Sequence, residues 1–169
     1  WSEEKNRWVT FYSYTPEKYG IIGMNFVSFV NGEAWLHDVN DVRNNFYTVQ
    51  YNTKITPVFV GEDTSTKKVW EVAKLEQFQT DQKCNWSAPI IVNDYNQLSR
   101  LAKTFVKKEE HWSNPFKRDL NDVTVPANVR ILNGRMLRST NLTVGYENDY
   151  TDEFTLRALV AEYIVSLAY

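Results

Sequence analysis

The sequence predicts a mainly β protein, in the form of an antiparallel β-sandwich with at most one or two short helices. Runs of β-branched and aromatic residues recur along the chain, which is typical of strands on a half-buried pleated surface. Asn-Gly pairs at 31–32 and 133–134 follow such runs and are strong hairpin signals. Many short strand-like segments separated by turn residues indicate two packed sheets.

The first half of the chain contains five expected strands. They cover residues 7–14, 25–30, 33–38, 46–51 and 54–60. Asn31 and Gly32 should join the second and third of these in a hairpin, because both residues tolerate the positive φ of a type I′ turn. Pro57 cannot donate a hydrogen bond to a neighbouring strand, so it places the fifth strand at a sheet edge or a bulge.

The segment after Gly61 carries mixed signals. Residues 63–66 are typical of a helix start, and Val69, Trp70 and Val72 fit one helical turn. We therefore expect a turn of helix that leads into a strand over 71–78. A further short apolar strand is expected at 87–92.

Two longer segments, 96–112 and 154–167, fit both a helix and a strand. Apolar residues recur at helical spacing in each. However, 104–112 also fits a charged edge strand, and the β-branched residues near 165 fit a closing strand. Around them, strands are expected at 129–132, 136–139 and 141–146, with a hairpin turn at 133–134.

Composition narrows the class of protein. The 169 residues carry a net charge of -2, and 15% of them are aromatic, which excludes a disordered chain. No stretch approaches the roughly 20 apolar residues of a bilayer span, and the small net charge provides no global basic field for nucleic acid. Without a Gly- or Pro-rich linker, we expect one β-rich domain over 1–169. Since the chain starts at Trp1 with no Met, we expect a fragment of a longer chain, its C-terminal part.

Two histidines give the first candidates for catalytic chemistry. His37 precedes Asp38, but adjacent strand residues point to opposite faces, which favours a surface or turn role. Glu109 and His111 would share a strand face with Glu110 between them, and a solvated charged edge is the favoured interpretation.

Other candidate groups are equally weak. Carboxylates for glycoside hydrolysis must face each other across about 5–10 Å, and nothing selects a pair. Cys84 has Lys83 beside it, which could lower the thiol pKa, but an incidental thiol is favoured. The candidate carboxylates for glycoside hydrolysis are Glu71, Glu76 and Asp81. With no phosphate-binding loop, nucleophile elbow or metal-spaced His/Cys set, we predict no enzyme and no catalytic, cofactor-binding or metal-ligating residue.

Surface features suggest contacts between subunits. Lys107-Lys108 and Lys117-Arg118 could meet phosphate, but neighbouring Glu109-Glu110 and Asp119 favour salt bridges between subunits. The sequons at Asn85 and Asn141 would matter only in a eukaryotic secretory path. Aromatic residues lie mostly inside strand patterns, so we assign them first to the core, second to interfaces and third to sugar binding.

Several motifs carry a resemblance to a known family. They are WVTFYSYTPE (8–17), SFVNGEAWLH (28–37), NNFY (44–47), VKKEEHW (106–112), KRD (117–119) and NGRMLR (133–138). Together they resemble β-rich structural proteins of tailed bacteriophages, in particular the muzzle (nozzle-like) proteins of crAss-like phages. The resemblance also favours strands at 104–112 and in the closing run.

This resemblance implies a virion component that forms a ring at the end of a short tail. The ring would close the tail channel before infection and let DNA pass on ejection. The implied partners are copies of the chain itself and other phage tail proteins, without a membrane span or specific nucleic-acid binding. The family offers no catalytic residue to carry over.

Two other functions compete with a structural role. A carbohydrate-binding β-sandwich module would need at least two exposed aromatic rings on one face, with Trp35, Tyr47 and Trp86 as candidates. A cell-wall hydrolase carried on a tail is the third hypothesis, and we expect no such activity.

Overall fold

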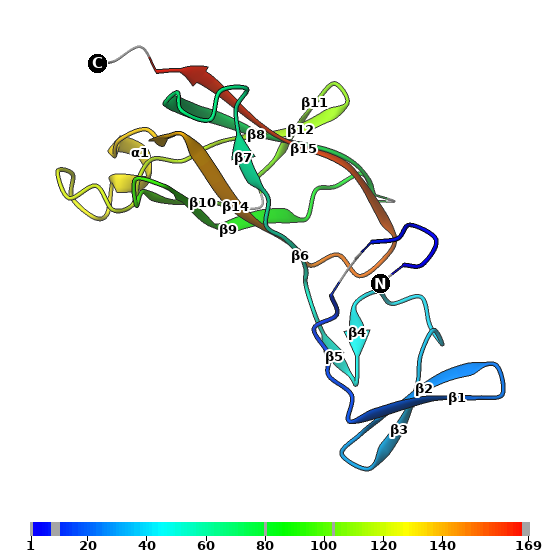
Figure 1. Ribbon diagram of the computed structural model, residues 1–169. Helices are drawn as coiled ribbons and strands as arrows, with labels where there is room; N and C mark the ends of the chain where they lie inside the picture. Colours follow the sequence, from blue (N-terminus) through cyan, green and yellow to red (C-terminus); the bar gives the residue numbers. More distant parts are fainter. Residues whose placement is uncertain (1, 8–10, 80, 103, 167–169) are drawn as a thin grey trace. The chain divides into compact units, whose positions relative to one another are not determined.

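The computed structural model describes residues 2–7, 11–79, 81–102 and 104–166 (Figure 1). It confirms a mainly β protein built from antiparallel sheets, with a single short helix among the described residues. Contacts group the chain into two compact units, Trp1–Tyr51 and Asn52–Tyr169. No Gly or Pro lies next to this boundary, so composition does not indicate it. That 1–169 forms one domain stays a prediction.

The first unit contains a three-stranded sheet and a small hairpin. In the sheet, β2 (Asn25–Val30) pairs with β1 (Lys18–Ile22) on one side and β3 (Glu33–Leu36) on the other. Asn31 and Gly32 have φ values of 52° and 79°, which confirms the predicted hairpin turn.

Three expectations about the first unit need correction. In the expected strand 7–14, residues 8–10 lie outside the described residues, and 11–14 are not in a strand. The expected strand 46–51 is a hairpin of β4 (Asn45–Phe46) and β5 (Val49–Gln50), because the chain turns at Tyr47 and Thr48 with φ values of 54° and 65°. Strand β1 was not predicted, since Gly20 interrupts its apolar pattern.

The second unit consists of two antiparallel sheets. One has the order β10-β9-β14, with β6 and β7 pairing along the other edge of β14. Its strands are β6 (Thr53–Ile55), β7 (Val58–Val60), β9 (Trp86–Asn93), β10 (Leu98–Leu101) and β14 (Asn141–Asn148). Pro57 separates β6 from β7 and accepts a hydrogen bond from Val144 N, 3.1 Å away, so its predicted place at a sheet edge is confirmed.

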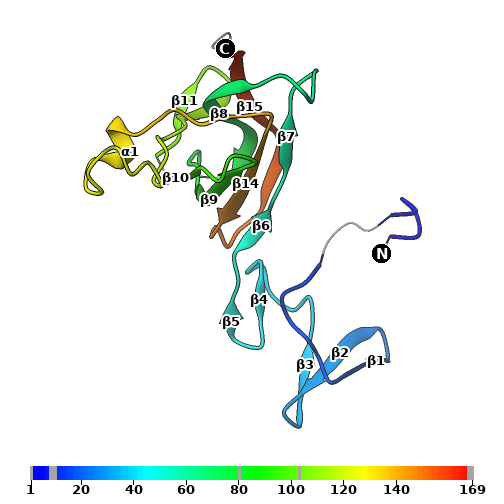
Figure 2. The same ribbon diagram turned by 60° about the vertical axis from the view of Figure 1, so that its left-hand side comes forward.

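The other sheet is organised around the twelve-residue strand β8. Its strands are β8 (Lys68–Gln79), β11 (Val106–Lys108), β12 (His111–Pro115), β13 (Arg138–Ser139) and β15 (Phe154–Val165). Both β12 and β13 pair with one edge of β8, and β15 pairs with the opposite edge along nearly the whole strand. Figures 1 and 2 show β8 and β15 running side by side.

Apolar side chains from both sheets form one core between them. Trp70, Ala73 and Leu75 of β8 face this core, and alternate residues of β14 are fully buried. The other members of the cluster are Trp86, Ala88, Ile91, Leu101, Phe105, Leu137, Leu142, Val144 and Tyr146. This is the two-layer arrangement of a β-sandwich, and it confirms the predicted fold class.

Two uncertain segments of the sequence are strands. Residues 96–112 form β10, β11 and the start of β12, and the closing run forms β15, although residue 167 lies outside the described residues. The expected helical turn at Val69, Trp70 and Val72 is wrong, because these residues belong to β8. The first residues of β8 are buried on both faces of the strand. Neighbouring apolar residues are therefore adjacent in sequence, and their spacing also fits a helical turn.

The predicted second hairpin is also wrong. Residues Arg130–Asn133 form the helix α1, which lies at one end of the sandwich (Figure 1). Gly134 has φ -63°, so the Asn-Gly pair is not a type I′ turn. A Cβ on Gly134 would lie 2.6 Å from Asp119 O and 2.7 Å from Arg130 O, so this glycine permits close backbone approach.

Candidate functional site

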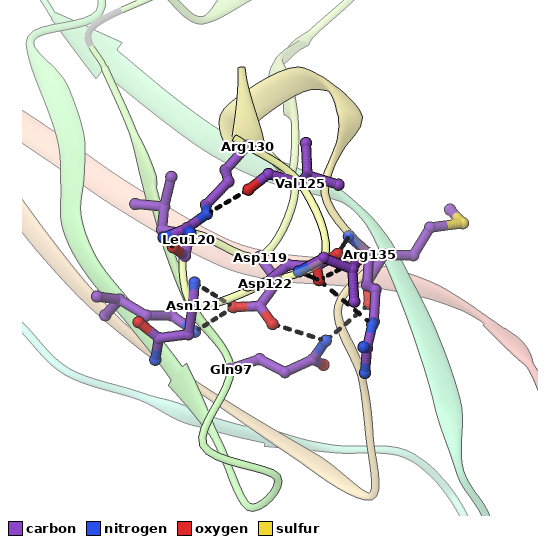
Figure 3. A network of polar contacts seen from close by, with 11 residues as sticks. Gln97, Asp119, Leu120, Asn121, Asp122, Val125, Arg130 and Arg135 are labelled. Atoms are coloured by element: carbon purple, nitrogen blue, oxygen red, sulfur yellow. Dashed lines mark hydrogen bonds and ion pairs between the residues drawn. The ribbon is translucent and has the colours of Figure 1, made fainter. Parts of the chain in front are cut away.

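A polar network joins the connection after β9 to the segment between β12 and β13 (Figure 3). Gln97 is at its centre: its Nε2 donates to Met136 O at 3.0 Å, and its Oε1 accepts from Arg138 N at 2.7 Å and from Asn93 Nδ2 at 2.9 Å. One amide side chain therefore holds together segments that are about forty residues apart in sequence.

Two buried aspartates, Asp119 and Asp122, stabilise the segment between β12 and β13 (Figure 3). Asp119 Oδ1 accepts from the backbone N–H groups of Leu98 and Asn121, at 3.1 and 2.9 Å. Asp122 Oδ2 accepts from Arg135 N at 2.8 Å, and its Oδ1 lies 3.5 Å from Arg135 Nε. Hydrogen bonds to Asp122, led by that of the Thr124 hydroxyl, hold the pKa of its carboxyl below its usual range.

This network forms one wall of a hollow of about 560 Å³. The residues around the hollow are Lys67, Tyr95, Gln97, Asp119, Arg135, Met136 and Arg138. Three of them are cationic and one is anionic. The carboxylate is buried and already accepts several N–H groups, so positive charge dominates the accessible surface.

Strand pairing brings two of these cations together. Arg138 lies opposite Val69, and Lys67 immediately precedes β8, so the pairing of β13 with β8 brings both cations to the same hollow. Lys67 Nζ lies 5.1 Å from the centre of the Tyr95 ring. Within the described part of the chain, the Arg138 guanidinium has no hydrogen-bond or ion-pair partner.

A second feature is the free edge of β15. Among the described strands, β15 pairs only with β8, so one edge of its backbone has no strand partner. Val160, Ile164 and Val165 on β15 are 44%, 52% and 51% exposed. Two ion pairs bridge β8 and β15, Lys74 with Glu162 and Glu76 with Arg157. A long, partly apolar edge of this kind is suited to pairing with another strand.

The histidine candidates occupy structural positions. His37 Nε2 lies 2.6 Å from the Ser28 hydroxyl, which is also 2.8 Å from Tyr47 OH. Ser28 is fully buried, so this contact does not present a nucleophile to a substrate. Asp38 is exposed with φ 58°, and within the described part of the chain it forms no hydrogen bond with the His37 ring, in agreement with a turn role.

The acidic residues considered for catalysis or metal binding do not come together in one site. Glu109 and Glu110 form the turn between β11 and β12 and do not share a strand face with His111, which corrects that expectation. Glu76 pairs with Arg157 and Asp81 with Lys83, while Glu71 is exposed on β8. No cluster of three or more His, Cys, Asp or Glu suited to a metal occurs among the described residues.

Other nominated residues are spread over the second unit. Lys107 lies 3.3 Å from Gln82 Oε1 and 6.0 Å from the Trp112 ring centre, whereas Lys117-Arg118 follows β12. In the sequons, Asn85 Nδ2 donates to Asp149 Oδ1 at 3.1 Å, and Asn141 begins β14.

Cys84 behaves as a structural thiol. Burial raises its pKa to about 11, and Lys83 is directed to Asp81, 3.6 Å away, so the structure does not support a lowering of the pKa by Lys83 and agrees with the favoured incidental thiol. At pH 8 the thiolate fraction should be far below that of a free cysteine, whose pKa is about 8.5. We expect reaction with a disulfide reagent to be at least about tenfold slower than for the urea-unfolded chain, and to accelerate above pH 10. Equal rates would contradict this prediction.

The proposed sugar-stacking residues do not form an exposed platform. Trp86 is fully buried in the sandwich core, while Trp35 and Tyr47 are half-buried in the first unit. A hollow of about 570 Å³ in that unit does have aromatic walls, but Tyr14 and Phe46 there stack on each other with centroids 4.2 Å apart. Burial, together with Tyr12 and Tyr47 nearby, raises the pKa of Tyr14.

Comparison with known proteins adds no assignment. No protein-family model matches the sequence, and no curated protein is significantly similar to it. Within the described residues, no helix has the length and apolar character that crossing a bilayer requires. The fold and sites therefore define the chain only as an antiparallel β protein with a cationic hollow and a free strand edge.

Proposed function

We propose that this chain is a non-enzymatic structural subunit of a bacteriophage tail that assembles with copies of itself into a ring. The free edge of β15, with its exposed apolar side chains, is the observation that carries the proposal. Edge-to-edge strand pairing satisfies backbone groups and buries apolar surface at the same time. A permanent ring contact of this kind buries more than about 1,000 Å².

The resemblance of the sequence motifs to phage muzzle proteins supports the biological setting. In that setting the ring lies in the virion, at the end of the tail, beside other tail proteins. It closes the channel before infection and lets DNA pass on ejection. Local contacts engage His37, Asp81 and Glu76, which is in keeping with a structural role.

Light scattering after size exclusion tests the assembly. We expect the chain to run as an oligomer, and a double variant Val160→Lys, Ile164→Lys to run as a monomer with an unchanged circular dichroism spectrum. Two lysines beside this edge would need costly desolvation when the next copy covers them in the ring. Val123→Lys, at a side chain 83% exposed in a loop, is the control and should leave assembly intact.

A monomeric chain at all concentrations, or assembly that survives both lysines, would contradict this role for β15. Mass spectrometry of purified tailed-phage particles tests the setting, because a virion protein must be present there. Binding to a glycan array by a chain that stays monomeric would favour the carbohydrate-binding alternative.

A further inference from the structure

The hollow beside β13 has a chemistry that ring assembly does not require. Its accessible charge comes from Lys67, Arg138 and Arg135, of which Arg135 is also ion-paired with the buried Asp122. The one carboxylate that lines the hollow, on Asp119, is buried and occupied by N–H donors. An uncompensated arginine in a concave site is suited to a phosphate, which its guanidinium binds through two parallel hydrogen bonds. Arg138 meets this description among the described residues.

The same hollow also offers apolar surface for a planar group. The Tyr95 side chain is 47% exposed, and Met136 is 40% exposed beside it. Aromatic rings of this kind stack with nucleobases, and such stacking is tolerant of base identity. A volume of about 560 Å³ is within the range of small-ligand sites.

The backbone that carries these groups is held in place before any ligand arrives. Gln97 accepts a hydrogen bond from Arg138 N, and Asp122 accepts one from Arg135 N. Tyr95 N donates to Asn93 Oδ1 at 3.0 Å. Because the backbone of these residues needs little ordering on binding, less free energy is lost when a ligand enters.

We propose that this hollow binds a nucleotide, with the phosphate at Arg138, Lys67 and Arg135 and the base against the Tyr95 ring. The shared chemistry is a phosphate ester joined to a planar base. Its source is either a free nucleotide or one unit of a single-stranded nucleic acid. The site is local: with a chain charge of -2, binding depends on these three cations and not on a long-range field.

Fluorescence polarisation with a fluorescein-labelled eight-residue oligothymidylate tests the proposal, with thymidine monophosphate and inorganic phosphate as competitors. The parent chain should bind the labelled strand saturably, and thymidine monophosphate should compete better than inorganic phosphate. The double variant Lys67→Gln, Arg138→Gln should weaken binding at least about tenfold. Its slope of log K against log salt should also become shallower by about 0.7, the value for one lost phosphate contact on a single strand.

The matched control is Lys54→Gln with Lys108→Gln, which removes the same charge from β6 and β11. This control should change affinity less than twofold. Tyr95→Leu should weaken competition by thymidine monophosphate while leaving competition by inorganic phosphate unchanged, since only the base uses the ring.

The outcomes separate the two sources of the ligand. A strand that binds more than about tenfold tighter than the monophosphate supports single-stranded nucleic acid, and equal affinity supports a free nucleotide. Absence of saturable binding by the parent, or an equal loss in the control, overturns the proposal. Inorganic phosphate that competes as well as the monophosphate overturns the role of the ring. None of these results depends on whether the chain forms a ring.

Discussion

Replacing Trp86 with alanine is expected to lower the free energy of unfolding by about 3–5 kcal/mol, the usual cost of truncating a large core aromatic residue. Trp86 is fully buried at the start of β9. Its ring meets Tyr146 and Phe154 edge to face, with centroids 6.4 and 5.8 Å apart, and its Nε1 donates to Gln77 Oε1 at 2.7 Å. The variant therefore loses packing between both sheets and leaves the half-buried amide oxygen of Gln77 without its donor.

Urea unfolding followed by circular dichroism measures this effect. Trp86→Phe keeps most of the ring contacts and should cost clearly less than Trp86→Ala. Tyr19→Ala, at a side chain 72% exposed in the first unit, is the control and should change stability by no more than about 0.5 kcal/mol. A loss below about 1 kcal/mol for Trp86→Ala would show that this ring is not part of a packed core.

Lys68→Ala should be the second most damaging change, at about 2–4 kcal/mol. Lys68 is only 1% exposed at the start of β8, and its Nζ donates to three backbone carbonyls, those of Asp63, Thr66 and Thr140, at 2.5, 2.8 and 3.3 Å. The same ammonium lies 5.6 Å from the centre of the Tyr163 ring. Truncation opens a cavity and removes the donor that ties the 63–66 loop to the strand.

Two further variants separate these contributions in the same unfolding experiment. Lys68→Met keeps most of the volume and loses the hydrogen bonds, so it should cost about 1–3 kcal/mol. Lys67→Ala changes the neighbouring exposed lysine and should be close to neutral. If Lys68→Met were as stable as the parent or more so, burying the ammonium would cost as much as its three hydrogen bonds contribute.

The two proposed activities depend on different parts of the protein. Assembly uses backbone groups of β15, and ligand binding uses side chains of the cationic hollow. Strand pairing along β15 uses backbone groups, so its specificity depends on which side chains flank the edge, such as Val160 and Ile164. The hollow uses Arg138 and its neighbours directly. Variants at one feature should therefore leave the other unchanged.

Local signals in the sequence were reliable where the local conformation is decided within a few residues. The Asn31-Gly32 turn was predictable because both residues must take positive φ and both favour it. The hairpin turn predicted from the same pair at 133–134 is wrong, because a short helix and the close approach of Gly134 to Asp119 O determine the conformation of that segment. Thr48 turns at φ 65° against its own preference, which no local rule would suggest.

Periodicity misled where neighbours bury both faces of a strand. Val69 and Trp70 are both buried, so the start of β8 lacks the alternation that identifies a strand. The closing run has helical spacing, yet pairing with β8 along nearly its whole length makes it β15. In both cases the partner strand, distant in sequence, supplies the hydrogen bonds that decide the conformation.

The candidate sites were even less accessible to sequence reasoning. Lys67 and Arg138 are about seventy residues apart and meet only because β13 pairs with β8. The nominated His37 and Cys84 were conspicuous by residue type, but burial and local hydrogen bonds occupy them. Arg138 carried no comparable signal, because a single arginine has no motif until its neighbours are known.

The sequence by itself determined the fold class of this protein. Aromatic and β-branched runs with short turns leave few alternatives to packed antiparallel sheets, because such side chains must be covered on at least one face. Only the tertiary structure decided which strands lie at edges, where α1 replaces a hairpin, and which cations converge on one hollow. Pairing over long sequence separations sets all three, and its energetics depend on contacts that no local stretch of sequence contains.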